Sequence, residues 1–149
     1  KSDYDGENIK VYPTRKDYTD SELALKYAID SGCTELLMFG MIGTRMDHTI
    51  ANLSLLLNCK GIDAVIIDGN NHIYMVSDEI TITAPVGETV SILPFSGDLK
   101  GVTTEGLEYP LKDSEIKIGT SIGVSNRMTK PSCHIKIKEG TALVIRSKD

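Results

Sequence analysis

Apolar positions recur at two different intervals along the 149-residue chain. Between residues 9 and 77, short runs of β-branched and other apolar residues are separated by longer stretches whose apolar positions recur every three or four residues. The longer interval is typical of an amphipathic helix, and a short apolar run between turn residues is typical of a buried strand. The pattern therefore predicts helices over 20–31 and 47–60 and strands over 9–12, 35–39 and 64–67.

Strand, helix, strand, helix, strand in that order is typical of βαβ units built around a parallel sheet. Units of this kind place functional loops at the carboxyl ends of their strands. The segments that follow 9–12 and 35–39 are therefore the first places to look for chemistry.

The helical interval disappears after Ser77. Seven of the 13 glycines and four of the 5 prolines lie between Pro85 and Gly140, as turns between short strands require. The expected fold class is α/β plus all-β, with a partial parallel βαβ domain over 1–76 and an antiparallel β-sandwich over 77–149. The strand over 72–76 would lead from one domain into the other, and the later strands are expected over 80–83, 89–93, 99–104, 116–118, 135–138 and 143–146.

Composition narrows the function classes. Hydrophobic residues make up 40% of the chain and charged residues 25%, as in an ordinary globular protein, and the net charge of −5 argues against nucleic acid as the main partner. No apolar run approaches the roughly 20 residues that span a bilayer. Three well-separated cysteines indicate reduced thiols and a cytoplasmic location. The chain begins at Lys1 with no methionine, so we expect it to lack an N-terminal portion.

The first candidate cluster is KDYTDSE, residues 16–22, at the start of the first predicted helix. Thr19 followed three residues later by Glu22 has the form of a capping box, which is a purely structural explanation. The functional alternative is that Asp17 and Asp20, beside Lys16 and a positive helix end, bind Mg²⁺ and polyphosphate oxygens. Both explanations remain open at this point.

The second cluster is GMIGTRMDH, residues 40–48, again between a strand and a helix. Two glycines three residues apart allow a sharp turn and close approach to a ligand, and Arg45 offers a planar fork of donors to phosphate. An ordinary turn, with Asp47 as a helix cap, is the structural alternative. The functional one gains weight because two successive strand-to-helix junctions each carry an aspartate and a basic residue.

The third cluster is GTSIGVSN, residues 119–126, in the β-rich half. Ser121, Ser125 and Asn126 are small polar residues among glycines, and they could hydrogen-bond the edge of a heteroaromatic ring. A β-turn built from ordinary turn residues explains the same letters.

Taken together, the three clusters resemble the thiamine pyrophosphokinase (thiamin diphosphokinase) family. The resemblance runs in the family's order through KDYTDSELALKYA, FGMIGTRMDHTIANLSLL, LKGVTTEGLEYPL and IGTSIGVSN, from about Val11 to Arg146. It implies an α/β nucleotide-handling domain, a thiamine-binding β-sandwich and a homodimer with thiamine between the subunits. It also implies transfer of a pyrophosphoryl group from MgATP to the hydroxyl of thiamine, which yields thiamine diphosphate and AMP.

Carried over by position, the resemblance makes Asp20, Arg45 and Asp47 the catalytic residues. Its thiamine contacts are Asp20, Ser125 and Asn126, and its metal ligands are Asp20 and Asp47. An aspartate near the thiamine hydroxyl could orient it or accept its proton, and Asp20 and Asp47 are both candidates. The ATP and phosphate contacts that it implies are Lys16, Asp17, Gly43, Thr44 and Arg45.

Two features depart from the family pattern. The family's earlier Gly-Asp-x-Asp-Ser segment has no counterpart, and further aspartates are expected upstream of Lys1. The chain has no tryptophan, so any aromatic stacking on thiamine must use tyrosine or phenylalanine. A non-catalytic thiamine- or nucleotide-binding module, or an inactive fragment of the enzyme, is therefore the alternative function.

Overall fold

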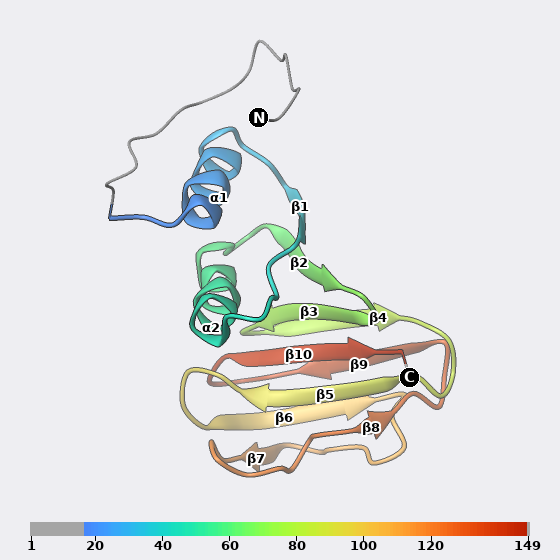
Figure 1. Ribbon diagram of the computed structural model, residues 1–149. Coiled ribbons are helices and arrows are strands. Elements are labelled where there is room, and N and C mark those ends of the chain that lie inside the picture. The colour runs from blue at the N-terminus through green and yellow to red at the C-terminus, as the bar shows by residue number, and fades with distance from the viewer. Residues whose placement is uncertain (1–16, 149) are drawn as a thin grey trace.

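The computed structural model describes residues 17–148. The predicted strand over 9–12 lies outside them. In Figure 1 two helices lie above and to one side of a stack of strands. The elements in chain order are α1 Asp20–Asp30, β1 Glu35–Phe39, α2 Met46–Leu55, the short 3₁₀ helix η1 Leu56–Asn58, β2 Asp63–Asp68, β3 Asn71–Val76, β4 Glu79–Thr83, β5 Thr89–Pro94, β6 Leu99–Glu105, β7 Ser114–Ile116, β8 Asn126–Arg127, β9 Ser132–Lys136 and β10 Ala142–Ser147.

The strands form two sheets. The larger has six strands in the order β1-β2-β3-β10-β5-β8, and the smaller has four in the order β4-β9-β6-β7. Strands β1 and β2 are parallel, as the βαβ pattern predicts, and every other pairing is antiparallel. The predicted fold class, a partial parallel α/β unit followed by an antiparallel β unit, is confirmed.

The six-stranded sheet separates two hydrophobic cores. Successive residues of a strand point to opposite faces: in β10, Leu143 packs with the helices, whereas Val144 packs against the four-stranded sheet. Leu25 of α1 and Leu56 of η1 fill the helix-side core together with Ile66 of β2. The middle of the molecule therefore has three layers: helices, mixed sheet and antiparallel sheet.

Strand β1 is an edge of the larger sheet, and among the described residues it pairs only with β2. Met38 of β1 is buried in the helix-side core, whereas Leu37 and Phe39, which point to the other face, are 61% and 65% exposed. Parallel strands usually have both faces covered. In the described part of this chain, helices cover one face of β1 only.

Candidate functional site

Helix α1 begins with the hydroxyl cap that the sequence pattern suggests. The Thr19 Oγ1 accepts a hydrogen bond from the backbone N–H of Glu22 at 3.2 Å, which satisfies one of the N–H groups left open at a helix start. Asp17 and Asp20 are exposed beside this cap, at the positive end of the helix dipole. Lys16 lies outside the described residues. The cap and a functional role for Asp20 are thus compatible.

The loop over 40–45 joins the end of β1 to the start of α2. Gly40 has a φ of 70°, a left-handed conformation that turns the chain sharply out of the strand and that glycine adopts without strain. Gly43, Thr44 and Arg45 are exposed. Arg45 is the N-cap residue of α2, and its side chain makes no capping hydrogen bond. Arg45 therefore leaves the N–H groups of Met46 and Asp47, the first two of α2, uncapped, and such groups can bind an anion.

Arg45 and Asp47 form a two-pronged ion pair at this exposed helix end. The guanidinium donates from Nε to Asp47 Oδ1 at 3.2 Å and from Nη2 to Oδ2 at 2.6 Å. The hydrogen bond from Arg45 lowers the pKa of Asp47, and the backbone N–H of His48 lowers it further. The same pairing raises the pKa of Arg45. Both groups are consequently charged at neutral pH, and the site presents a guanidinium and a carboxylate side by side.

Two polar residues of α2 hold the loop from its buried side. Asn52 Nδ2 donates to the Met41 carbonyl at 2.7 Å, and Thr49 Oγ1 accepts from the Gly43 N–H at 3.2 Å and lies 3.3 Å from the Gly43 carbonyl. Thr49 and Asn52 are 7% and 9% exposed. Sequence analysis assigned Thr49 no role. The signal was two poor helix formers, three residues apart, at positions where the helix pattern calls for apolar residues.

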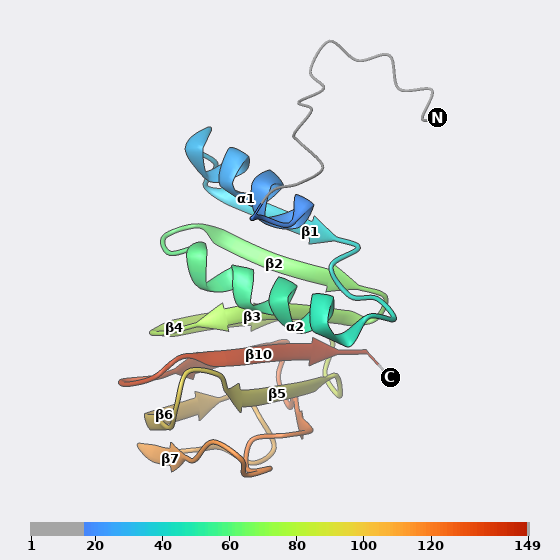
Figure 2. The same cartoon turned by 60° about the vertical axis from the view of Figure 1, so that its left-hand side comes forward.

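The N-terminal ends of both helices lie at one edge of the parallel strands. In Figure 2 the arrowheads of β1 and β2 point to the same side, and α1 and α2 both begin on that side. This is the carboxyl edge, where βαβ units carry their functional loops. The structure thus brings Asp20 to the same edge as the Arg45–Asp47 pair.

Ser125 and Asn126 occupy different environments although they are neighbours. Ser125 is exposed, has a φ of 57°, and its N–H donates to Ser91 Oγ at 3.0 Å. Asn126 is buried, and its amide holds the backbone of Tyr109: Oδ1 accepts from the Tyr109 N–H at 3.0 Å, and Nδ2 donates to the Tyr109 carbonyl at 2.8 Å. In this structure the Asn126 side chain supports a neighbouring loop, whereas Ser125 faces outward.

Tyr109 is presented to solvent by this arrangement. Its side chain is 67% exposed although its backbone is clamped on both sides by Asn126. An exposed aromatic ring on a fixed backbone is suited to ring stacking. The sequence contains the segment LEYPL around it, but the letters alone do not show that this ring faces outward.

Within one chain, the six-stranded sheet separates the predicted phosphate-binding loop, which follows β1, from the predicted thiamine contact Asn126 in β8. β1 and β8 are the two outer strands of this sheet, five strand spacings apart. At about 4.8 Å per spacing, Phe39 and Asn126 are about 24 Å apart across the sheet. The register places both near the same end, because the paired residues Ile67–His72, His72–Arg146, Arg146–Val90 and Val90–Asn126 run from one outer strand to the other.

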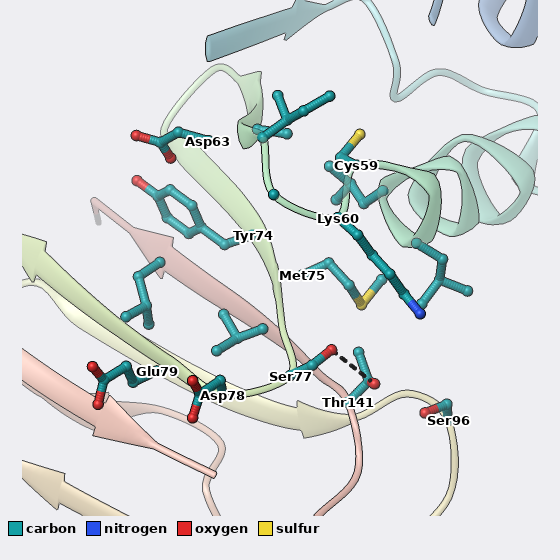
Figure 3. A pocket seen from close by; sticks show the side chains of 17 residues that line it. Cys59, Lys60, Asp63, Tyr74, Met75, Ser77, Asp78, Glu79, Ser96 and Thr141 are labelled. Atoms are coloured by element: carbon teal, nitrogen blue, oxygen red, sulfur yellow. Dashed lines mark hydrogen bonds between the residues drawn. The ribbon is translucent and has the colours of Figure 1, made fainter. Parts of the chain in front are cut away.

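A cavity of 880 Å³ opens at the other end of β2. Pairing between β2 and β3 covers Ile66–Asp68 and Asn71–Ile73, and toward Asp63 and Val76 the two strands diverge. Figure 3 shows Asp63 beside the Tyr74 hydroxyl on one side of the cavity, and Ser77 hydrogen-bonded to Thr141 at 3.1 Å on the other. Burial raises the pKa of Tyr74, and the Asp63 charge adds to that increase. Asp20, Arg45 and Asp47 do not line this cavity.

The described residues contain no ready-made metal cluster and no membrane-spanning helix. Among residues 17–148 no group of three or more His, Cys, Asp or Glu side chains is arranged to hold a metal ion. Mg²⁺ in phosphate-transfer sites is commonly held by one or two carboxylates together with substrate phosphates. Asp20 and Asp47 are carboxylates of that kind, and their role as ligands of Mg²⁺ stays a prediction. No helix described here has the length and apolar character needed to cross a membrane.

Comparison with known families gives two adjoining matches. Residues 2–68 match the family described as "Thiamin pyrophosphokinase, catalytic domain". Residues 77–142 match the family described as "Thiamin pyrophosphokinase, vitamin B1 binding domain".

Relatives from Bacillus subtilis and Oryza sativa match over 95% and 67% of this chain. Thiamine pyrophosphokinase of Bacillus subtilis (strain 168) is 33% identical over 147 residues, which covers 95% of this chain and 68% of the relative. Thiamine pyrophosphokinase 1 of Oryza sativa subsp. japonica is 26% identical over 105 residues, which covers 67% of this chain and 40% of the relative.

Solved structures agree. The crystal structure of thiamine pyrophosphokinase from Bacillus subtilis superposes with a TM-score of 0.85 at 33% identity and covers 91% of this chain and 65% of that one. The protein from Geobacillus thermodenitrificans gives 0.86 at 31% identity, over 95% of this chain and 66% of that one. The chain thus spans about two thirds of the length of these structures.

A parallel α/β unit with a glycine loop at its carboxyl edge, followed by an antiparallel β unit, defines the chain as a mixed α/β protein. The family matches make the assignment specific. The chain belongs to the thiamin pyrophosphokinase family.

Proposed function

We propose that this protein is a thiamine diphosphokinase, which transfers the pyrophosphoryl group of ATP to the hydroxyl of thiamine and releases AMP. The observation that carries the proposal is the shared carboxyl edge, where α1 begins at Asp20 and α2 begins beside the Arg45–Asp47 pair. The family assignment supports it. The free cysteines in the described residues suit a reducing compartment, and we place the protein in the cytoplasm.

The loop and the two helix starts supply the phosphate end of the site. Attack of a primary hydroxyl on the β-phosphorus of ATP requires alignment and neutralisation of charge more than covalent help. The open N–H groups of α2 and the Arg45 fork bind phosphate oxygens, with Gly43 and Thr44 close to them in the same loop. Lys16 and Asp17 complete this end in the proposal.

Asp20 and Asp47 divide the remaining roles. In the proposed site both hold Mg²⁺, which when bound would neutralise phosphate charge as the pyrophosphoryl group moves. The pKa of Asp47 is lowered by Arg45, so this carboxylate is a weaker proton acceptor than an ordinary aspartate. Both Asp47 oxygens also accept hydrogen bonds from Arg45, so we assign to Asp20 the contact with the thiamine hydroxyl, where it orients the hydroxyl and takes its proton.

The thiamine end lies on the β-sandwich. Ser125 offers an exposed hydroxyl, and Asn126 fixes the backbone from which the Tyr109 ring projects. We propose that Ser125 hydrogen-bonds the ring edge of thiamine and that Tyr109 stacks on the ring in place of tryptophan. Asn126 contributes by holding Tyr109, in addition to the direct contact that the resemblance implies.

A second copy of the chain completes the site in this proposal. Within one chain the ends of β1 and β8 are about 24 Å apart, which is more than the length of a thiamine molecule joined to a phosphate group. A homodimer in which the sandwich of one subunit faces the α/β edge of its partner removes that separation. The two ligands are then ATP on one subunit and thiamine between the two.

The test is a coupled product assay on the protein. Incubation with MgATP and thiamine is expected to yield AMP and thiamine diphosphate in equal amounts, and Arg45→Ala is expected to lower the rate about 100-fold or more because a transition-state charge partner is lost. Lys100→Ala is the matched control, since Lys100 is an exposed cation that pairs with Glu139 on the sandwich. Formation of ADP, or turnover that does not depend on thiamine, contradicts the proposal.

A binding module without catalysis is the second candidate. It is favoured by one observation, that both carboxylate oxygens of Asp47 accept hydrogen bonds from Arg45. Stabilisation of the protein against heating by thiamine, with no AMP formed, would support this second function over the first.

A further inference from the structure

Helix α2 has polar residues on its buried side where apolar ones would pack better. Thr49 and Asn52 are 7% and 9% exposed, next to the helix-side core that includes Met41 and Leu55. Both residue types are weak helix formers, and a buried polar group costs free energy unless it is hydrogen-bonded. Neither helix formation nor core packing explains them.

Their hydrogen bonds all lead to one short segment. Asn52 reaches the Met41 carbonyl over eleven residues, and Thr49 reaches both backbone groups of Gly43 over six. The Met41 side chain is itself 8% exposed, so this end of the loop is anchored by packing as well. The loop segment 41–43 is therefore fastened to the same helix that carries Arg45 and Asp47 at its start.

We propose that Thr49 and Asn52 are positioning residues for nucleotide binding: they fix the backbone over 41–43 so that Gly43, Thr44 and the Arg45 fork face the phosphate groups. This inference rests on the proposed function, because it assigns phosphate to that loop. Neither side chain touches the ligand. Each acts through the loop, whose irregular backbone would otherwise adopt several conformations and lose the fixed geometry that anion binding requires.

Four variants separate positioning from simple folding. Thr49→Val keeps the side-chain volume, Asn52→Leu keeps the branched shape, and both remove the bonds to the loop, whereas Thr49→Ser keeps the hydroxyl. Ser54→Ala is the matched control on the same helix, because the Ser54 hydroxyl donates to the Ile50 carbonyl within α2 at 2.9 Å and does not hold the loop.

Three measurements are made on the variants. Amide hydrogen exchange at Gly43, without ligand, is expected to accelerate about 5- to 10-fold in Thr49→Val and to stay unchanged in Thr49→Ser and Ser54→Ala. In the product assay, Thr49→Val and Asn52→Leu are expected to raise the KM for ATP about 5- to 10-fold while the KM for thiamine stays within about twofold. Binding of MgATP and of inorganic tripolyphosphate, followed through the Gly43 and Thr44 amides, reports on the same loop without turnover.

The outcomes are distinguishable. If the wild-type protein turns over thiamine but Thr49→Val and Asn52→Leu leave the KM for ATP unchanged, the inference is wrong and the proposed function stands. If MgATP binds at the loop and weakens in these variants but no AMP forms, the inference stands and the proposed reaction fails. Equal increases in the KM for ATP and the KM for thiamine, together with a fall in Tm, would show a merely structural role and would overturn the inference.

Discussion

Ser125 has a backbone conformation that a serine rarely adopts. Its φ of 57° is one of two positive values among the described non-glycine residues, the other being 48° at Asp113. This region costs an L-residue about 1 to 2 kcal/mol, because its Cβ crowds the following carbonyl. Such strain often marks residues held for binding, and Ser125 is also exposed to solvent.

Replacing Ser125 with glycine should therefore separate stability from binding. Ser125→Gly is expected to stabilise the fold by about 1 kcal/mol, because the crowded Cβ is removed, while it weakens thiamine binding because the hydroxyl is lost. Urea unfolding and a thiamine titration measure the two effects. Asp113→Gly is the control: it relieves a similar conformation and should leave thiamine affinity as it was. Loss of affinity in both variants would contradict the role assigned to Ser125.

The ion pair between Arg146 and Glu88 is largely buried, so it affects the stability of the fold. Arg146 of β10 and Glu88, the residue before β5, approach to 3.4 Å between Nη1 and Oε2, and their side chains are 17% and 10% exposed. Within the described part of the chain, Glu88 Oε2 and Arg146 Nε have no hydrogen-bond partner. The pair is therefore held by charge attraction with little access to water. Removing one partner from such a pair lowers the free energy of unfolding substantially.

Glu88→Ala is expected to lower the free energy of unfolding by about 3 kcal/mol, because it leaves the Arg146 charge buried and unpaired. Denaturation in urea followed by circular dichroism measures this. Glu139→Ala removes the acid of an exposed pair, Lys100–Glu139, and should change stability little, since exposed pairs are screened by water. Similar losses in both variants would show that burial is not the cause.

Element by element, the sequence pattern succeeds where the interval of apolar residues is long and regular. It predicts α1 and the parallel pair β1 and β2 within one or two residues, since a buried stripe or a continuous apolar run specifies the element. The helix predicted over 47–60 instead ends at Leu55 and tightens into η1. Strand β8 is only two residues long and carries no periodic signal, so it was not predicted.

Strand partners are the part of the fold that the sequence cannot show. Alternation tells which face of a strand is buried, but not which strand lies beside it. Strand β3 pairs with β2 on one side and β10 on the other, so the large sheet continues across the proposed boundary between 76 and 77. The two-domain division itself stays a prediction. In the same way, the sequence motif predicts a ligand contact for Asn126, whereas its hydrogen bonds to the Tyr109 backbone are seen only in the structure.

For the whole molecule, one histidine links pH to stability. His72 of β3 lies opposite Arg146 of β10 in the sheet. Burial lowers the pKa of His72, the Arg146 charge lowers it further, and Glu88 opposes the shift. The unfolded chain, with an ordinary histidine pKa of about 6.5, therefore takes up a proton more readily than the folded one. Stability from this group is present above about pH 6.5 and falls as the pH decreases below it.

His72→Gln removes that proton uptake and should flatten the dependence of Tm on pH between about 7 and 5. Thermal unfolding at several pH values, for wild type and variant, provides the comparison. An unchanged slope would mean that other groups cause the acid sensitivity.

The one-sided pairing of β1 also affects how the 149-residue chain will behave at high concentration. Within residues 17–148 the outer edge of β1 has no strand partner, and the exposed side chains of Phe39 and Leu37 lie on the same strand. Such an edge is a template for intermolecular β-pairing. The net charge of −5 opposes such contacts at low ionic strength and is screened by salt. Aggregation of this polypeptide should accordingly begin at β1, and a charged substitution such as Leu37→Lys is the most direct way to suppress it.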